Sequence, residues 1–381
     1  TDIRLNRALI LIRKLIFLSI IVLCGPFTHA QDSSTDTRPG IAPDIREDES
    51  KLKVQRGNTV VVPIPMSNPT LGTGLVLGGA YFYGQTAEQK KTQPASLTAL
   101  GGLYTDNDSR AVVLAQQNYW RNDRWRFTGA IGGADLRLSL LAPDDTDDGS
   151  SVDWRINGLV LFAKLSRRIK GDWYGGLFTR VVDADQSITL EGDSIQSEFG
   201  LGDVTSAGLG AIFEYDSRDN PFNSSSGRYF KIDALFNDET LGSDATYQSY
   251  SGAFRSYHRL SDSVVLAWEV QGCQRVGEVP LWDACTIKLR GFSVTDYLGK
   301  VSTSGQAEAR WQLSPRWGLV GFAGVGYFGS SFNEFRSRES IPSYGAGVRF
   351  TVLKAKGINL RVDFARSRDD EAIHVSVGEA F

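Results

Sequence analysis

Short stretches in which apolar and polar side chains alternate recur along the chain from residue 58 to its end. In the stretch 357–367, Ile358 and Leu360 fall on one face, and Asn359 and Arg361 fall on the other. A β-strand places successive side chains on opposite faces, so each stretch predicts one strand with an apolar and a polar face. About sixteen strands are predicted, an even number as in closed bacterial barrels, at 58–67, 72–83, 95–104, 110–121, 124–136, 153–164, 172–182, 205–216, 227–237, 247–258, 263–273, 302–313, 317–328, 342–353, 357–367 and 371–381.

The composition suits a wall with lipid on one side and water on the other. Apolar residues make up 41% of the chain and aromatic residues 11%. Apart from one run near the N-terminus, no apolar stretch is long enough to cross a membrane as a helix. The predicted fold class is therefore all-β, a transmembrane antiparallel β-barrel. A soluble β-sandwich also alternates, but it rarely needs so many strands in one chain.

The connections between the predicted strands alternate in length. The short ones are at 122–123, 259–262, 314–316 and 354–356. The longer ones, acidic or rich in Gly and Ser, are at 137–152, 183–204, 274–301 and 329–341. Short periplasmic turns and long outer loops are typical of outer-membrane barrels. We therefore expect a cell outer-membrane protein with both termini in the periplasm, in contact with outer-membrane lipids and lipopolysaccharide.

The N-terminal region is predicted to lie outside the barrel. Residues 1–30 resemble a cleaved secretion signal, because basic residues up to Lys14 precede a short apolar run and the run is followed by Ala30. An N-terminal anchor helix is the alternative. Residues 31–57 are polar and predict a short periplasmic tail, and residues 58–381 predict the barrel.

Two cysteines, Cys273 and Cys285, lie beyond the predicted signal. An even pair in an oxidising compartment predicts a disulfide, with two unpaired thiols as the alternative.

Several function classes are disfavoured. Beyond the predicted signal the only histidines are His258 and His374, and neither has a convincing nucleophile beside it in sequence, so we expect no enzyme. The chain carries a net charge of −3, which gives no basic surface for nucleic acid. The acidic run at 144–148 does not have the spacing of a calcium loop, and we expect neither a metal site nor a cofactor.

Three stretches together resemble the BamA/TamA superfamily of bacterial surface-antigen barrels. The first is the turn 214–222 with Gly227, the second is Leu289-Arg290-Gly291-Phe292, and the third is the last hairpin ending at Phe381. The residues that carry the turn motif are Asp216, Arg218, Asp219, Asn220, Pro221 and Gly227. The resemblance implies a short member that lacks the POTRA modules usual ahead of the barrel, and hence a separate periplasmic or POTRA-bearing partner.

The resemblance also implies an inward-folded sixth extracellular loop. Its Arg290-Gly291-Phe292 tip would enter the lumen, where Arg290 would pair with the acidic residue on the next strand, Glu308. The family usually has a second acidic residue on the strand after that, where this chain has Gly324. The second partner of Arg290 would therefore have to come from elsewhere.

In the family, the first and last strands meet at a weak seam. Here Pro63 and Pro65 lie in the first predicted strand, and Phe381 ends the last one. Because proline lacks an N–H, each proline either removes a bond at the seam or lies where the strand ends. The predicted function is insertion or translocation of protein or lipid at the outer membrane through this seam. A passive pore or a structural barrel is the alternative.

Overall fold

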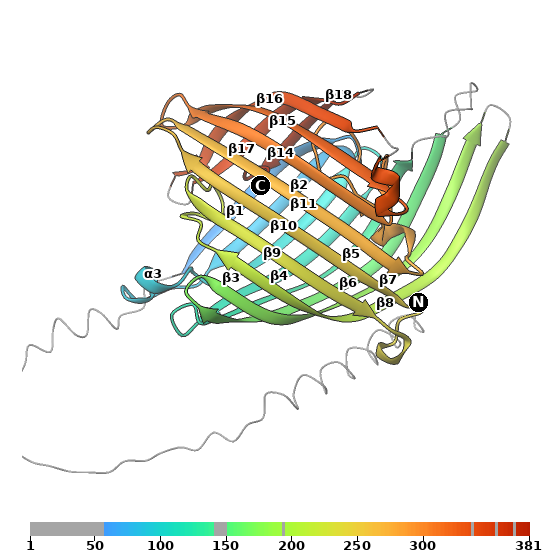
Figure 1. Cartoon of the computed structure of the whole chain (residues 1–381), viewed down its shortest axis with the longest axis horizontal. Helices are drawn as coiled ribbons and strands as arrows, with labels where there is room; N and C mark the ends of the chain where they lie inside the picture. Colours follow the sequence, from blue (N-terminus) through green and yellow to red (C-terminus); the bar gives the residue numbers. More distant parts are fainter. Residues whose placement is uncertain (1–56, 141–150, 193–194, 337–338, 355–356, 369–370) are drawn as a thin grey trace, which may run out of the picture.

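The computed structural model describes residues 57–140, 151–192, 195–336, 339–354, 357–368 and 371–381. Sixteen antiparallel strands close into a barrel, and neighbours in the chain are neighbours in the wall (Figure 1). The strands are β1 Asn58–Asn68, β2 Gly72–Phe82, β3 Leu97–Thr105, β4 Arg110–Trp120, β5 Trp125–Leu140, β6 Ser151–Lys170, β7 Trp173–Gly192, β8 Ile195–Asp216, β9 Gly227–Asn237, β10 Tyr247–Arg259, β11 Val264–Gly277, β14 Val301–Gln312, β15 Trp317–Gly329, β16 Ile341–Leu353, β17 Ile358–Arg366 and β18 Glu371–Val377. The predicted fold class is confirmed.

The remaining elements lie in the connections. They are α3 Gln89–Thr92, η1 Glu239–Leu241, η2 Leu281–Asp283, η3 Phe332–Arg336, and the two-residue strands β12 Cys285–Thr286 and β13 Leu298–Gly299, which pair with each other. Among the described residues no helix is both long and apolar enough to cross a membrane. The predicted signal (1–30) and most of the predicted tail (31–57) lie outside the described residues.

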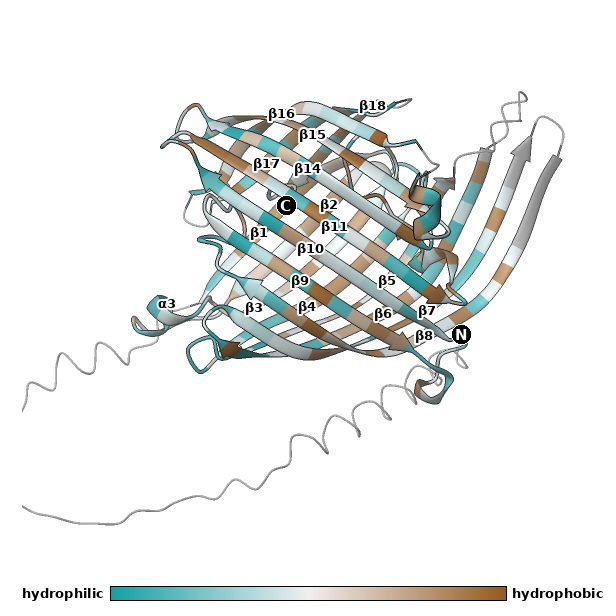
Figure 2. Cartoon of the chain, viewed as in Figure 1, coloured by the Kyte–Doolittle hydropathy of each residue, from teal (hydrophilic) through white to brown (hydrophobic). Residues whose placement is uncertain are grey.

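The alternation in sequence becomes an alternation between the two faces of the wall. On β2, Leu75 and Leu77 are 51% and 56% exposed on the outside, while Val76 between them is half-buried towards the lumen. Figure 2 shows hydrophobic and hydrophilic residues interspersed along strand after strand. A barrel whose outside is apolar and whose lumen is polar is stable only where lipid covers its outer face.

The wall has unequal height. β1 and β2 have 11 residues each, whereas β6 and β7 have 20 and β8 has 22, and the longer strands rise beyond the rest of the barrel (Figure 1). The predicted long loop at 183–204 is therefore wrong, because β7 continues to Gly192 and β8 starts at Ile195. Above the lipid both faces of a strand are wet, so the alternation that marks a strand is lost while the backbone ladder continues. Part of the predicted 137–152 loop (141–150) lies outside the described residues.

The last strand is shorter than predicted. β18 ends at Val377, and Gly378, with a φ of 92°, turns the chain away from the wall. Phe381 was predicted to end this strand; it is instead only 8% exposed and packs with Tyr257, with 6.5 Å between ring centroids. Residues 378–381 thus fold against the lumen side of the wall and are not part of the seam.

Candidate functional site

The first and last strands close the barrel through very little pairing. β1 pairs with β2 along its whole length, from Asn58 opposite Phe82 to Asn68 opposite Gly72. With β18 it makes one residue pair in the described part of the chain, Ser67 opposite Val375. The seam predicted between the first and last strands is therefore the most weakly paired junction in the wall of the barrel.

Pro63 and Pro65 contribute to this weakness. In an antiparallel strand, alternate residues bond to alternate neighbours. Because the β1–β2 ladder runs unbroken through both prolines and neither has an N–H to donate, the intervening residues must make the bonds to β2. The two prolines therefore present their backbone towards the β18 side, and Pro65, which lies opposite Val377 in the register of the Ser67–Val375 pair, removes one donor from the seam. Both prolines precede Ser67 along β1, and both are exposed on the outer face of the wall.

The sixth loop, residues 278–300, folds into the barrel. Its Arg290 is 5% exposed and pairs with Glu308 of β14 at 2.9 Å and with Asp363 of β17 at 3.1 Å. The guanidinium also lies over the Phe322 ring, 3.5 Å from its centroid. The loop backbone is held as well, because the Ser343 hydroxyl donates to the Arg290 carbonyl. A buried arginine needs such partners, since an unpaired buried charge is costly.

Asp363 is the second partner of Arg290, which sequence reasoning left open. It also accepts from Arg349 at 2.5 Å, and Arg349 reaches Glu379 at 2.8 Å. Arg310 pairs with Glu308 at 2.7 Å. In the sequence, Asp363, Arg349 and Arg310 each alternate with apolar residues of their strands, and this alternation was the available signal for them. We call Arg290, Glu308, Asp363, Arg349, Arg310 and Glu379 the lumen cluster.

Gly324 has no room for the acidic side chain usual in the family. A Cβ there would lie 2.8 Å from the Gly305 carbonyl oxygen and 3.0 Å from Leu289 of the sixth loop. The loop thus packs an apolar side chain where the family has a carboxylate. Phe292, which is 2% exposed, joins Ile287 and Leu289 in an apolar cluster inside the lumen.

The loop tip contacts both sides of the seam. On one side, the Gly291 N–H donates to Nε2 of His374 on β18 at 3.1 Å. On the other, the Ser293 hydroxyl and the Val294 N–H each lie 3.0 Å from the hydroxyl of Thr70, in the turn between β1 and β2. Gly291 has a φ of 110°, a conformation that favours glycine. We call the stretch 291–294 the seam clasp.

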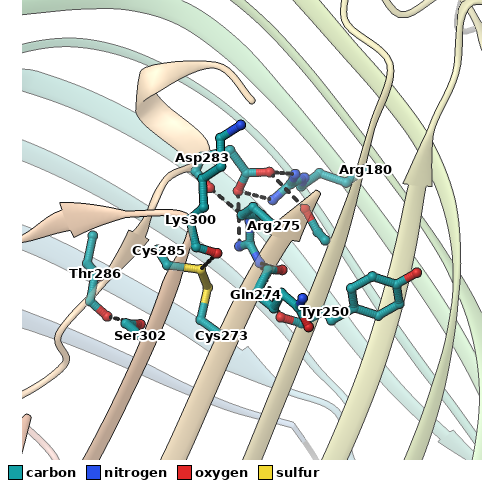
Figure 3. The surroundings of a disulfide bond; sticks show 11 residues. Arg180, Tyr250, Cys273, Gln274, Arg275, Asp283, Cys285, Thr286, Lys300 and Ser302 are labelled. Carbon is teal, nitrogen blue, oxygen red and sulfur yellow. Dashed lines mark hydrogen bonds and ion pairs between the residues drawn. A yellow bond between two sulfur atoms is a disulfide. The ribbon is translucent and has the colours of Figure 1, made fainter. Parts of the chain in front are cut away.

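The predicted disulfide between Cys273 and Cys285 is present and ties the start of the sixth loop to β11 (Figure 3). Beside it, Asp283 pairs with Arg180 of β7 and with Arg275 of β11. Burial alone would raise the pKa of Asp283, but the two arginines outweigh burial and hold the pKa below its usual range. The loop is therefore anchored covalently and ionically at its start, and by Arg290 at its tip.

The turn motif forms a compact hydrogen-bonded structure at the opposite end of the barrel. Asp216 pairs with Arg218 at 2.8 Å. The Asp219 carboxylate accepts from the N–H groups of Asn220 and Ser225, and the Asn220 side chain accepts from the Phe222 N–H, all at 2.9 Å. Pro221 lies within the turn, and Gly227 begins β9. These residues shape a turn, and the Ser224 carbonyl within it accepts a hydrogen bond from Arg310 of the lumen cluster.

A cavity of about 610 Å³ lies at the seam. Its walls come from β1, β18 and the sixth loop, with Arg361 of β17 and Gln306 of β14 at its inner side. No group of three or more His, Cys, Asp and Glu side chains within the described ranges is placed to hold a metal ion.

These features define an integral membrane β-barrel whose lumen is occupied by one of its own loops and whose wall closes at a weakly paired junction. The family model for the Omp85 superfamily domain matches residues 96–381, most of the chain, and the protein belongs to this superfamily. The predicted family is confirmed. The protein is thus an outer-membrane barrel of a non-enzymatic family of insertases and translocases.

Solved structures support the fold. BamA from Haemophilus ducreyi lacking POTRA domains 1–3 matches with a TM-score of 0.54 and 13% identity over 85% of this chain and 70% of that one. CdiB from Acinetobacter baumannii matches with a TM-score of 0.55 and 13% identity over 85% and 60%, and CdiB from Escherichia coli with 0.51 and 11% over 89% and 71%. No curated protein sequence matches the chain significantly.

Proposed function

We propose that this barrel inserts or translocates protein or lipid at the outer membrane by parting sideways at the junction of β1 and β18. In this proposal both termini are periplasmic, the sixth loop is extracellular in origin, and a separate periplasmic partner delivers the cargo. The observation that carries the proposal is the single Ser67–Val375 pair at this junction. In lipid, unpaired backbone groups cost several kcal/mol each, so a short ladder flanked by prolines is the place where the wall opens most easily.

The arrangement of the sixth loop supports lateral opening over conduction through the lumen. Arg290 and the apolar cluster of Ile287, Leu289 and Phe292 occupy the interior, and the seam clasp lies directly against the junction. A passive pore would need a lumen free of such packing.

Locking the seam tests the proposal. Cysteines at Ser67 and Val375 face each other across the junction and should form a disulfide on oxidation. Cysteines at Ser67 and Thr73 share one position but join β1 to β2, which already pair fully, and serve as the matched control. In cells lacking the native protein, we expect the seam-locked barrel to fail to restore outer-membrane integrity, the control to restore it, and a reductant to rescue the locked form.

Full activity of the oxidised seam-locked barrel would overturn lateral opening. A large, steady conductance in planar bilayers, unchanged by the lock, would favour the passive pore instead. Purification of the barrel from native membranes after cross-linking tests the partner, which we expect to be a periplasmic protein.

A further inference from the structure

Most arginines whose side chains the structure describes pair with a carboxylate. This holds even at exposed positions, since Arg110 pairs with Asp135 at 3.3 Å and Arg366 with Glu371 at 3.0 Å. The arginines of the same set that have no carboxylate partner are Arg121, Arg124, Arg167, Arg228 and Arg316. All of them lie in a short turn, or within a few residues of a strand end, at the end of the barrel that carries the short turns. Unpaired arginines are therefore concentrated at one end of the wall.

Arg167 projects from the outer face of β6. The next residue, Arg168, lies on the other face of the strand and pairs with the buried Asp123 at 2.7 Å, so Arg167 points outwards. Nearby on the outside are Leu165 and Ile169, which are 36% and 64% exposed. An arginine among such lipid-facing residues is costly at the middle of the bilayer but is tolerated near its two surfaces. Arg167 therefore lies at the level of the lipid headgroups.

Aromatic side chains lie at the same level of the wall. Trp125 is opposite Arg167 in the β5–β6 ladder, and the guanidinium lies 5.5 Å from the centroid of the Trp125 ring. Trp173, the first residue of β7, is 37% exposed, and its ring centroid lies 4.9 Å from that of Phe213 and 4.8 Å from that of Tyr215. Girdles of aromatic residues mark the boundary between membrane and water in such barrels. The aromatic neighbours thus agree with the position of Arg167 among the headgroups.

Two more cations lie beside Arg167. Lys170 is opposite Trp173 in the β6–β7 ladder, so the two side chains share the outer face. Arg124 ends the turn before β5, and its carbonyl accepts from the Arg168 N–H at 2.8 Å, which places this residue next to the end of β6. Like Arg167, both are exposed, and their side chains make no ion pair or hydrogen bond within the described ranges. Three positive charges without a protein counterion thus gather at the end of β6, a setting that favours an anion.

We propose that Arg124, Arg167 and Lys170, which we call the β6 cation cluster, bind the phosphate of an anionic phospholipid. The acyl chains of this lipid lie along the apolar outer face of β6, where Leu165 is exposed. A water-soluble acidic protein suits the cluster less well, because lipid covers the face from which Arg167 projects. β6 is five strands away from β1 in the wall, so the site does not depend on opening of the seam. The bound lipid fixes the level at which the tall side of the barrel sits in the membrane.

Lipid binding to the purified barrel in non-ionic detergent, measured by native mass spectrometry, tests the proposal. The probes are dioleoyl phosphatidylglycerol, dioleoyl phosphatidylcholine, which has the same chains but no net charge, and glycerol phosphate, which has the phosphate but no chain. We expect phosphatidylglycerol to bind at least about tenfold more tightly than either of the other two, because only this lipid offers both a net negative charge and a hydrocarbon part.

Substitutions in the β6 cation cluster should weaken phosphatidylglycerol binding. We expect a loss of about tenfold for Arg167→Gln and of about fivefold each for Arg124→Gln and Lys170→Gln, whereas Arg167→Lys should retain most of the binding. Arg137→Gln is the matched control, since it removes one positive charge from a side chain that is 50% exposed near the other end of β5, and it should leave binding unchanged. All of these side chains are exposed, so the variants should keep the circular-dichroism spectrum of the parent barrel.

Equal binding of phosphatidylglycerol and phosphatidylcholine would overturn the proposal, as would unchanged binding in the Arg167→Gln variant or an equal loss in Arg137→Gln. Competition with decaglutamate, an acidic peptide confined to water, tests the rival occupant. We expect no displacement of the lipid, and displacement would overturn the lipid site and assign the cluster to an acidic protein. These outcomes are independent of the seam-lock experiment, because Ser67 and Val375 are not part of the β6 cation cluster.

Discussion

Arg290 and Asp363 lie 73 positions apart in the chain and meet inside the lumen at 3.1 Å. Their contact joins the tip of the sixth loop to the second-to-last strand of the wall. Glu308 completes the pairing from β14. The loop is thereby fixed to strands that belong to the last third of the barrel, on the β18 side of the seam.

Removing the Arg290 side chain should destabilise the barrel. Arg290→Ala leaves two buried carboxylates without one of their cations, and we expect a loss of about 3 kcal/mol or more in the free energy of unfolding, measured by urea titration in detergent. Arg366→Ala breaks the exposed pair with Glu371, whose side chains are 59% and 73% exposed, and should cost less than about 1 kcal/mol. Equal effects of the two substitutions would contradict a structural role for Arg290.

Adding one methyl group at Gly324 should loosen the loop. The new Cβ would meet the Gly305 carbonyl oxygen at 2.8 Å, so Gly324→Ala should lower the free energy of unfolding by about 1–3 kcal/mol. Gly321, on the same strand, has no atom within 4 Å of its Cβ position, and Gly321→Ala should leave stability unchanged or raise it by up to about 1 kcal/mol. If both alanines were tolerated equally, Leu289 would not be packed against Gly324.

Acid should release the start of the sixth loop. The pKa of Asp283 is lower in the folded barrel than in the unfolded chain, so its ion pairs stabilise the fold above the ordinary aspartate pKa of about 4 and this contribution is lost as pH falls below it. Reduction of the Cys273–Cys285 disulfide by a water-soluble phosphine should therefore become faster below about pH 4. The rate is compared with the rate at which the same reagent reduces a model disulfide at each pH, which corrects for the pH dependence of the reagent itself.

Asp283→Asn should accelerate this reduction about tenfold at neutral pH and remove the added pH dependence, since Arg180 and Arg275 lose their carboxylate. Asp238→Asn, in the cap of η1 in a different loop, is the control and should not change the rate. A rate in the Asp283→Asn variant that still rises on acidification would place the sensitive group elsewhere.

Restoring a backbone donor to β1 should strengthen the seam. Pro65→Val returns an N–H on the side facing β18, opposite Val377 in the register that Ser67 and Val375 set, and we expect hydrogen exchange at Val375 and its β18 neighbours to slow about tenfold for the bond gained. Pro94→Val, in the connection before β3, should not affect exchange in β18. Unchanged exchange in the Pro65→Val variant would mean that this proline does not limit the pairing.

Much of the barrel was predictable, because lipid on one side and water on the other impose an alternation that the sequence must carry. The bounds of β9, Gly227–Asn237, were predicted without error for this reason. β7 and β8 were predicted too short because, beyond the lipid, nothing constrains which face is apolar. The inward turn of Phe381 depends on Gly378, whose conformation leaves no periodic signal.

The candidate site was predicted only in part. The family motif identified Arg290 and Glu308, and the alternation placed Asp363 on the polar face of its strand. That Asp363 is the second partner depends on how deeply the loop enters the lumen, which the spacing of residues does not encode. The seam clasp was not predicted, since Thr70 and His374 are ordinary residues until the fold brings them to one place.

Because the seam clasp bonds to His374 on one strand and to Thr70 beside the other, the two strands cannot separate without breaking one of these attachments. Movement of the sixth loop in the lumen and opening of the β1–β18 junction are thus coupled. A fluorophore placed on the seam clasp would report opening of the junction. A small molecule that strengthened the contacts of the clasp would keep β1 and β18 together and inhibit lateral opening.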